Sequence, residues 1–199
     1  MKDYASLADE QLALLYAEGD FRAFDQLLER NQQKLFSYIL FVVHDTEVAN
    51  DVFQETFVKV ITKLQEGKYS DTGKFHFWLI RIAHNVIMDN YRHQKSAHFV
   101  EPTADNDLNK LRSNELMDIN RENEYVNAQV MTDVRRLMDA LPAPQREVVY
   151  MRFYQNLSFK EISEITGVSI NTSLGRMRYA LINMRRMAKE HHIQLNMEL

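Results

Sequence analysis

The chain has 199 residues, of which 45% are hydrophobic, and a formal net charge of −4, so it is long enough for one ordinary domain or two small ones. It contains no cysteine, which excludes disulfide bonds and cysteine-based metal sites. With only 5 glycines and 3 prolines, the composition predicts an all-α fold with long helices. No apolar run approaches the roughly 20 residues of a membrane span, and residues 1–5 lack the plan of a signal peptide, so we expect a soluble cytoplasmic protein.

Apolar periodicity in the first half predicts three or four helices, over residues 9–18, 20–43, 46–64 and from 75 onward, with a loop over 65–73. The stretch from Phe99 to Glu124 is polar, acidic and poor in apolar residues, so it buries too little surface to order itself. We therefore expect two small helical domains, residues 1–96 and 127–199, joined by a flexible acidic linker over 97–126.

Two stripes run along the helix expected over 46–64. One is apolar and suits the core; its members are Ala49, Val52, Phe53, Phe57, Val60, Ile61 and Leu64. The other recurs at i, i+3, i+4 and i+7 and is mostly polar; its members are Asp51, Gln54, Glu55 and Val58. The second stripe indicates a helix surface separate from the core face.

The helix that starts at Phe75 has two distinct sides. Leu79, Ile82, Ala83 and Val86 recur at helical spacing and are expected in the core. The other side carries Trp78, Arg81, Asn85, Met88 and Arg92. This side is either a solvated face with a half-buried Trp78 or a surface for single-stranded DNA. In the second case cations hold phosphates, an aromatic ring stacks on a base, and an Asn pairs with a base edge.

Charge is unevenly distributed along the chain. Basic residues prevail over 74–95 and from 144 to the end, whereas acidic residues prevail over 99–125 between them. Two basic regions on either side of an acidic connector suit two nucleic-acid contacts joined by a linker. Blocks of charge are also common on ordinary solvated faces, so this pattern alone does not decide between the two.

A helix-turn-helix is predicted in the last third of the chain. Ser158 and Glu161 form a capping box, so a helix is expected to start there, and Gly167 ends it. A second helix is expected after Ser169, a residue that favours the N-cap position. Two short helices joined by a tight turn with Gly place the second helix in the major groove of DNA.

The second helix of this motif is expected to be amphipathic. The face that we expect to pack against the rest of its domain contains Leu174, Met177, Leu181, Met184 and Ala188. The other face is expected to meet DNA and contains Thr172, Gly175, Arg176, Tyr179, Asn183 and Arg186, with Arg178 at its flank. The alternative is a basic amphipathic helix that contacts another protein.

Four segments, in this order around a linker, resemble bacterial RNA polymerase sigma factors of the extracytoplasmic-function type, the minimal two-domain class. The first segment contains Asp9, Glu10, Leu12, Gly19, Asp20, Ala23, Phe24 and Leu27. The second contains Ala49, Asp51, Val52, Phe53, Gln54, Glu55, Thr56 and Phe57, and the third is the run from Phe77 to Asn85. The fourth starts at Leu141, Pro142, Gln145, Arg146 and Glu147 and continues through the helix-turn-helix.

The resemblance implies a transcription initiation factor with core RNA polymerase and promoter DNA as partners, and an anti-sigma factor as a possible regulator. It implies that Asp51, Gln54, Glu55 and Val58 bind core polymerase. The residues implied for the downstream promoter element, which is opened and whose flipped base is held, are Tyr69, Lys74, Trp78, Arg81, Asn85 and Arg92. Those implied for the upstream element, read as duplex, are Thr172, Gly175, Arg176, Arg178 and Tyr179. The recognition helix departs from the family pattern at Ser173, Leu174 and Gly175, so the promoter sequence does not follow from it.

No catalytic constellation is visible in the sequence, and we expect no enzyme activity, no cofactor and no metal site. The seven histidines lack the spacing of metal ligands. One alternative is a stand-alone helix-turn-helix regulator that binds duplex DNA without polymerase, although a sensory or phosphoacceptor β/α domain is expected there. Another is an all-helical hydrolase, which needs clustered carboxylates or paired histidines.

Overall fold

The computed structural model describes residues 3–70, 73–97, 132–191 and 193. Within these ranges every regular element is a helix, which confirms the all-α prediction. The helices are η1 (Tyr4–Ser6), α1 (Asp9–Ala17), α2 (Phe21–Val43), α3 (Thr46–Gln65), α4 (Phe75–Ala97), α6 (Ala143–Phe153), α7 (Phe159–Thr166) and α8 (Ile170–Glu190). Residues 132–139 are also helical. The predicted linker lies almost entirely outside the described residues.

The described helices fall into two compact units. The first contains α1 to α4, and the segment Lys160–Val168, most of α7, is grouped with it; the second contains α6 and α8. The predicted boundaries 1–96 and 127–199 stay predictions. None of the helices in the described residues is long and apolar enough to cross a membrane.

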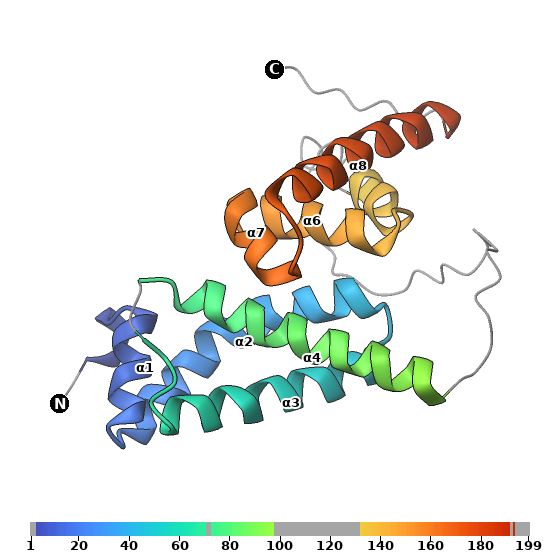
Figure 1. Ribbon diagram of the computed structural model, residues 1–199. Helices are drawn as coiled ribbons and strands as arrows, with labels where there is room; N and C mark the ends of the chain where they lie inside the picture. The colour runs from blue at the N-terminus through green and yellow to red at the C-terminus, as the bar shows by residue number, and fades with distance from the viewer. Residues whose placement is uncertain (1–2, 71–72, 98–131, 192, 194–199) are drawn as a thin grey trace. The chain divides into compact units, whose positions relative to one another are not determined.

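In the first unit α2, α3 and α4 pack against one another, and α1 packs on all three (Figure 1). The helix starts follow local chemistry: Asp45 caps α3 by accepting a hydrogen bond from the Val48 N–H at 3.0 Å. His44 ends α2 in the left-handed region at φ 57, which turns the chain sharply into α3. The predicted bounds of α1, α2 and α3 differ from the observed ones by at most one residue, and α4 ends at Ala97, five residues past Arg92, the last residue predicted on its outer side.

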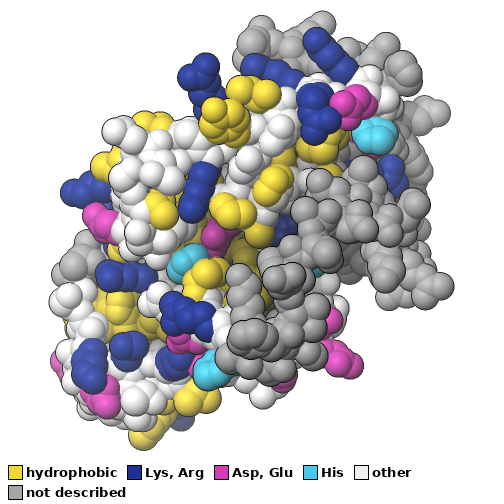
Figure 2. All heavy atoms as spheres, turned by 45° about the vertical axis from the view of Figure 1, so that its right-hand side comes forward, with side chains coloured by type: hydrophobic (Ala, Val, Ile, Leu, Met, Phe, Trp, Pro, Cys, Tyr) yellow, Lys and Arg dark blue, Asp and Glu magenta, His cyan; other side chains and the backbone are white. Residues whose placement is uncertain are grey.

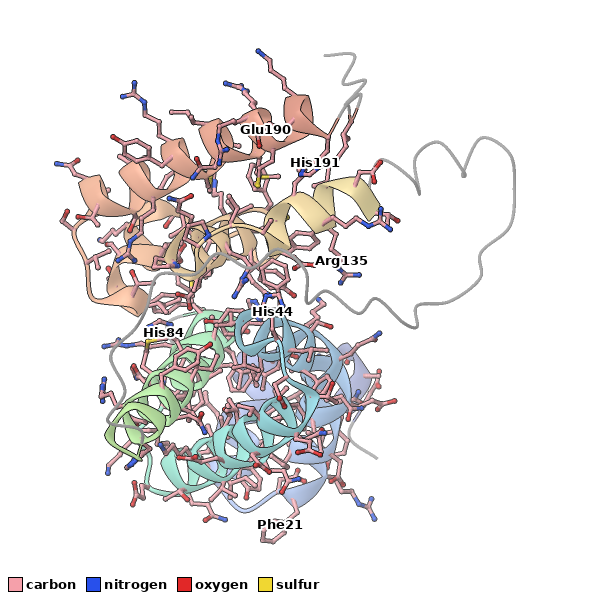
Figure 3. The ribbon with its side chains drawn as sticks, turned by 90° about the vertical axis from the view of Figure 1, so that its right-hand side faces the viewer. Phe21, His44, His84, Arg135, Glu190 and His191 are labelled. Atoms are coloured by element: carbon pink, nitrogen blue, oxygen red, sulfur yellow. The ribbon has the colours of Figure 1, made fainter. Side chains whose placement is uncertain are left out.

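The core of the first unit is apolar and well filled. Its largest fully buried side chains are Leu12, Leu27, Leu35, Tyr38, Ile39, Leu64, Leu79, Ile80 and Ile87. Ring contacts run across α1, α2 and α3, with centroid distances of 4.9 Å between Tyr16 and Phe24 and of 6.2 Å between Phe24 and Phe57. Phe21 is 70% exposed and points away from the helices (Figure 3), and its ring meets that of Tyr16 edge-on, with the centroids 6.1 Å apart.

In the second unit α6 packs on α8. The buried side chains of α8 are Ser173, Met177, Ala180, Met187 and Ala188. The prediction that Leu174 and Leu181 belong to the core face was wrong, because their side chains are 43% and 38% exposed. The buried side of α8 includes the small residues Ser173 and Ala180, and it is rotated away from the predicted side, so that Leu174 and Leu181 lie outside it.

Candidate nucleic-acid interface

The predicted single-stranded DNA face lies on the outward side of α4. Leu79, Ile82 and Val86 are buried, as predicted, so the helix presents its opposite side to solvent. There, Arg81 and Asn85 are exposed and the Trp78 side chain is half-buried. Trp78, Arg81 and Asn85 are spaced by three and four residues, which places them on adjacent turns of one face. The sequence prediction that these three side chains share a face agrees with their burial.

Trp78 is supported by two aromatic rings from the start of α4 and the loop before it. Its centroid lies 5.0 Å from that of Tyr69 and 5.7 Å from that of Phe75, and Tyr69 lies 5.6 Å from Phe75. Phe75 is buried, and Tyr69 is only 7% exposed. Tyr69 therefore packs against Trp78 from the interior of the unit. The predicted contact of Tyr69 with DNA stays a prediction. The two rings contact the indole, and because Trp78 is only half-buried, part of its side chain stays accessible.

The remaining residues predicted for this surface are cations. Lys74 is exposed directly before α4, and Arg92 is exposed near the far end of the same helix. Arg92 donates to the Asp89 carboxylate at 2.6 Å, and Asp89 also lies 3.7 Å from Lys59 of α3. Because these pairs are exposed, each contributes little to folding, and Arg92 can exchange Asp89 for a phosphate at small cost.

The end of the loop is held by a residue that sequence reasoning did not assign to any site. The backbone N–H of Phe75, the first residue of α4, donates to Oε1 of Glu10 in α1 at 2.9 Å. At the other end of the loop, Nε2 of Gln65 donates to the Tyr16 hydroxyl at 3.0 Å. These bonds join residues 65 and 49 positions apart. No local pattern signals them, because periodicity and capping report only on neighbours in the chain.

The stripe predicted to bind polymerase lies on the outer side of α3. Asp51, Gln54 and Glu55 are exposed, and Val58 is 61% exposed beside them. Glu55 pairs with Lys59 one turn later, at 2.8 Å. The structure thus brings the four residues together on one surface, where an exposed valine sits among acceptors of hydrogen bonds. A partner that offers cations and an apolar side chain fits this surface.

The helix-turn-helix begins and turns where the sequence predicts. α7 starts at Phe159, directly after Ser158, and Gly167 adopts φ +67 in the turn, a conformation that favours glycine. Ser169 caps α8, since its Oγ accepts from the Thr172 N–H at 3.0 Å. The start of α8 is therefore defined by local bonds, which is what a recognition helix needs near its N-terminus.

The five residues predicted to meet the upstream element differ in accessibility. Thr172, Arg178 and Tyr179 are exposed, Tyr179 by 62%, whereas Gly175 and Arg176 are half-buried. Asn183, which was placed on the same face, donates instead to Oε1 of Gln145 in α6 at 2.9 Å. Asn183 thus helps hold α8 on α6, and the outward face is narrower than predicted.

Basic side chains stand among apolar and neutral ones over the face shown in Figure 2. Within the described ranges, no group of three or more His, Cys, Asp or Glu side chains is placed to hold a metal ion. The α4 and α8 surfaces consist of cations, an amide and aromatic rings, which suit binding to nucleic acid.

Two family models match the chain in this order. Residues 27–97 match the model described as Sigma-70 region 2, and residues 131–174 match the one described as Sigma-70, region 4. The first covers most of α2 and all of α3 and α4, and the second covers α6, α7 and the start of α8. Each of the three surfaces therefore falls, wholly or in part, within a matched region.

Relatives match over most of the chain. The RNA polymerase sigma-H factor of Pseudomonas aeruginosa is 28% identical over 180 residues, which are 85% of this chain and 88% of that protein. The extracytoplasmic-function sigma factor SigE of Mycolicibacterium smegmatis is 25% identical over 194 residues, 95% of this chain and 72% of that protein. The fold is similar to that of the sigma factor RpoE solved with the anti-sigma factor NepR from Bartonella quintana. That match has a TM-score of 0.61 and 19% identity, and it covers 83% of this chain and 96% of that one.

Proposed function

The chain belongs to the extracytoplasmic-function type of RNA polymerase sigma factors, and from this membership we propose which of its surfaces carries each step of initiation. It binds core RNA polymerase, recognises promoter DNA and aids strand opening. In our proposal the polymerase supplies all the chemistry of RNA synthesis, and this chain acts without catalysis, in the cytoplasm, where the chromosome lies.

Core polymerase binds to the stripe of Asp51, Gln54, Glu55 and Val58 on α3. The observation that supports this role is that the four side chains share one exposed surface of α3, with Val58 61% exposed among polar groups, so that a partner could cover an apolar side chain and pair with the polar ones together. The carboxylates of Asp51 and Glu55 beside it orient the partner, because charges at an interface set its register and suppress wrong partners.

Strand opening depends on α4 and the loop before it. Taking a base out of the stack costs a few kcal/mol, so a site that is already formed lowers the cost of holding the base. Part of the Trp78 ring is accessible to a base, and the rest of the ring packs against Tyr69 and Phe75. Asn85 is placed to meet a base edge, and Lys74, Arg81 and Arg92 supply cations for the phosphates. The supported indole of Trp78 is the single observation that carries this assignment.

The upstream element is read as duplex by the exposed face of α8. Thr172, Arg178 and Tyr179 are the accessible contacts, with Arg176 and Gly175 beside them. Arg residues here serve phosphates or guanine edges, and a residue without a side chain at 175 lets the backbone approach the DNA.

An anti-sigma factor is proposed as the regulator of this chain. The observation that supports this proposal is that a protein of similar fold was solved with the anti-sigma factor NepR.

The assignment of the polymerase surface is tested by co-elution with purified core RNA polymerase in size-exclusion chromatography at moderate salt. Wild type is expected to co-elute, and Glu55→Lys is expected to elute alone with an unchanged helical spectrum, because it reverses the charge on the stripe. Asp25→Lys, an exposed charge reversal on α2, is the matched control and should still co-elute. If Glu55→Lys co-elutes with unchanged affinity, the stripe on α3 is not the polymerase surface.

A further inference from the structure

Helix α1 carries the first of the four family segments, yet none of the surfaces described above includes it. Besides packing on α2, it makes hydrogen bonds at both ends of the loop between α3 and α4. Tyr16 accepts a hydrogen bond from Gln65, the last residue of α3, at 3.0 Å. Glu10 accepts one from the N–H of Phe75, the first residue of α4, at 2.9 Å. One short helix thus holds both ends of the loop that leads into the predicted DNA face.

The bond from Phe75 to Glu10 acts as a helix cap supplied from elsewhere in the chain. The first N–H groups of a helix have no partner within the helix, and an acceptor there stabilises the helix start. A carboxylate is a favourable acceptor because the N-terminus of a helix carries partial positive charge. Glu10 therefore fixes the position at which α4 begins.

Helix α1 is itself held rigidly against α2. The Arg30 guanidinium donates to the Asp9 carboxylate at 3.0 Å and to the Leu7 carbonyl at 2.6 Å. The Asn31 amide donates to the other Asp9 oxygen at 2.8 Å. Leu12 on the inner side of α1 is fully buried. Because α1 cannot shift easily on α2, it can serve as the fixed support from which the loop ends are positioned.

The consequence falls on Trp78, which lies one turn after Phe75 in α4. Its ring rests on Phe75 and on Tyr69, which belongs to the loop whose ends are held. We propose that Glu10 is a positioning residue for strand opening, which acts through the Phe75 N–H to hold Trp78 where it receives a base. The Tyr16–Gln65 bond holds the other end of the same loop. This inference rests on the proposed role of Trp78 in binding the flipped base.

Three variants and one control separate positioning from folding. Glu10→Ala removes the acceptor, whereas Glu10→Gln keeps an oxygen at the same place and loses only the charge. Tyr16→Phe removes a single hydroxyl and keeps the ring that packs on Phe24. Asp25→Ala, which removes an exposed carboxylate from α2, is the control.

The first measurement uses the fluorescence of the full chain. Trp78 is the only tryptophan, so the emission reports on this site alone. Glu10→Ala is expected to shift the Trp78 emission and to increase its quenching by acrylamide, while Glu10→Gln and Asp25→Ala stay close to wild type. An unchanged emission in Glu10→Ala means that Glu10 does not position Trp78 and overturns the proposal.

The second measurement uses holoenzyme on a promoter selected from a random library by the wild-type holoenzyme, with 2-aminopurine in the opened region. Glu10→Ala is expected to slow strand opening by about fivefold, the factor that corresponds to the loss of a helix cap, with initial duplex binding unchanged. Glu10→Gln is expected to restore most of the rate, and Tyr16→Phe to slow opening by a smaller factor. The assays are run well below the melting temperature of each variant, which is measured by circular dichroism.

Two results would count against the inference. If opening by Glu10→Ala equals that of wild type, Glu10 has no positioning role. If opening and duplex binding fall together and Glu10→Gln gives no rescue, Glu10 serves only to stabilise the unit. Trp78→Ala on the same promoter distinguishes the two proposals: if it also leaves opening unchanged, the proposed role of Trp78 fails, whereas a slow Trp78→Ala beside a normal Glu10→Ala rejects only the inference about Glu10.

Discussion

The two surfaces proposed for DNA differ in how much of their structure is formed in advance. On α4, the key aromatic ring rests on two buried rings, and hydrogen bonds from α1 hold both ends of the preceding loop. On α8, the accessible residues Thr172, Arg178 and Tyr179 stand on an exposed side of a helix whose buried side packs against α6. The first surface is a supported site, and the second is an exposed helix face.

This difference matches two different physical tasks. Holding an unstacked base requires a surface whose shape is fixed in advance, because the entropy lost in ordering a flexible surface adds to the free energy cost of unstacking. Reading a duplex requires side chains that reach into a groove of known width, and an exposed helix meets this need without a pocket. A substitution on α4 should therefore affect opening, whereas one on α8 should affect initial binding.

The largest effect is expected from Trp78→Ala. Stacking of a base on an aromatic side chain contributes about 1–3 kcal/mol, so opening should slow by roughly 5- to 150-fold while duplex binding stays near wild type. Trp78→Phe keeps an aromatic ring against Tyr69 and Phe75, so its rate of opening should lie between those of wild type and Trp78→Ala. The measurement is the rate of 2-aminopurine fluorescence increase in holoenzyme. A loss of duplex binding as large as the loss of opening would break the comparison.

The converse effect is expected from Arg176→Ala on α8. Binding to upstream duplex should weaken by about 1–3 kcal/mol if the guanidinium contacts a base, and the rate of opening from the bound complex should not change. Arg136→Ala, which removes an exposed cation from residues 132–139, is the control for charge alone. Affinity is measured by fluorescence anisotropy of labelled duplex with holoenzyme. Equal losses in both variants would reduce Arg176 to a general electrostatic role.

Gly175→Ala separates stability from DNA contact at one position. A Cβ added at Gly175 meets no atom within 4 Å, so the protein itself accommodates alanine. The helix should gain about 0.5–1 kcal/mol, because glycine loses more backbone freedom than alanine on folding. If the backbone at 175 approaches DNA closely, affinity for upstream duplex falls even as the melting temperature rises. If stability rises while affinity is unchanged, Gly175 does not belong to the surface that binds the upstream duplex. Leu181→Ala, at another exposed position of α8, is the control for a change of side chain on this helix.

The sequence predicted those parts of the structure that depend on near neighbours in the chain. The apolar period located α3, and Ser169 located the start of α8, because these signals act between near neighbours in the chain. The core side of α8 was predicted only in part: Met177 and Ala188 are buried as expected, whereas Leu174 and Leu181 are exposed. The buried positions Ser173 and Ala180 are small, so the bulkier leucines drew the prediction to the adjacent stripe.

The support of the α4 surface could not be predicted for a different reason. The bond between Glu10 and the Phe75 N–H spans 65 residues, and only the packing of α1 against the rest of the unit brings the two groups together. Periodicity along a helix shows which side is apolar, but it does not show which polar group of another helix meets its end. The residues predicted to touch DNA could be listed from a pattern, whereas the residues that hold them in place could not.

The smallest effect is expected from Asp139→Asn, which should change the stability of the second unit and leave that of the first unit unchanged. Burial raises the pKa of the Asp139 carboxyl, although Arg146 and Arg135 oppose this effect. The folded state then holds its proton more tightly than the unfolded state, so stability falls as pH rises from about 4, the usual pKa of an Asp, through the raised value. Asp139→Asn lacks this loss.

The melting temperature of Asp139→Asn should therefore exceed that of wild type at neutral pH, by no more than a few degrees, and the gap should close as pH falls toward 4. Arg146 also donates to the Asp139 backbone carbonyl at 3.1 Å, a bond that the variant keeps, so the change isolates the carboxyl charge. Calorimetry over a pH series is the measurement. A gap that widens at low pH would mean that the attraction of the arginines outweighs burial. A shift in opening kinetics would mean that the second unit influences the α4 site, contrary to the division of tasks between the two surfaces.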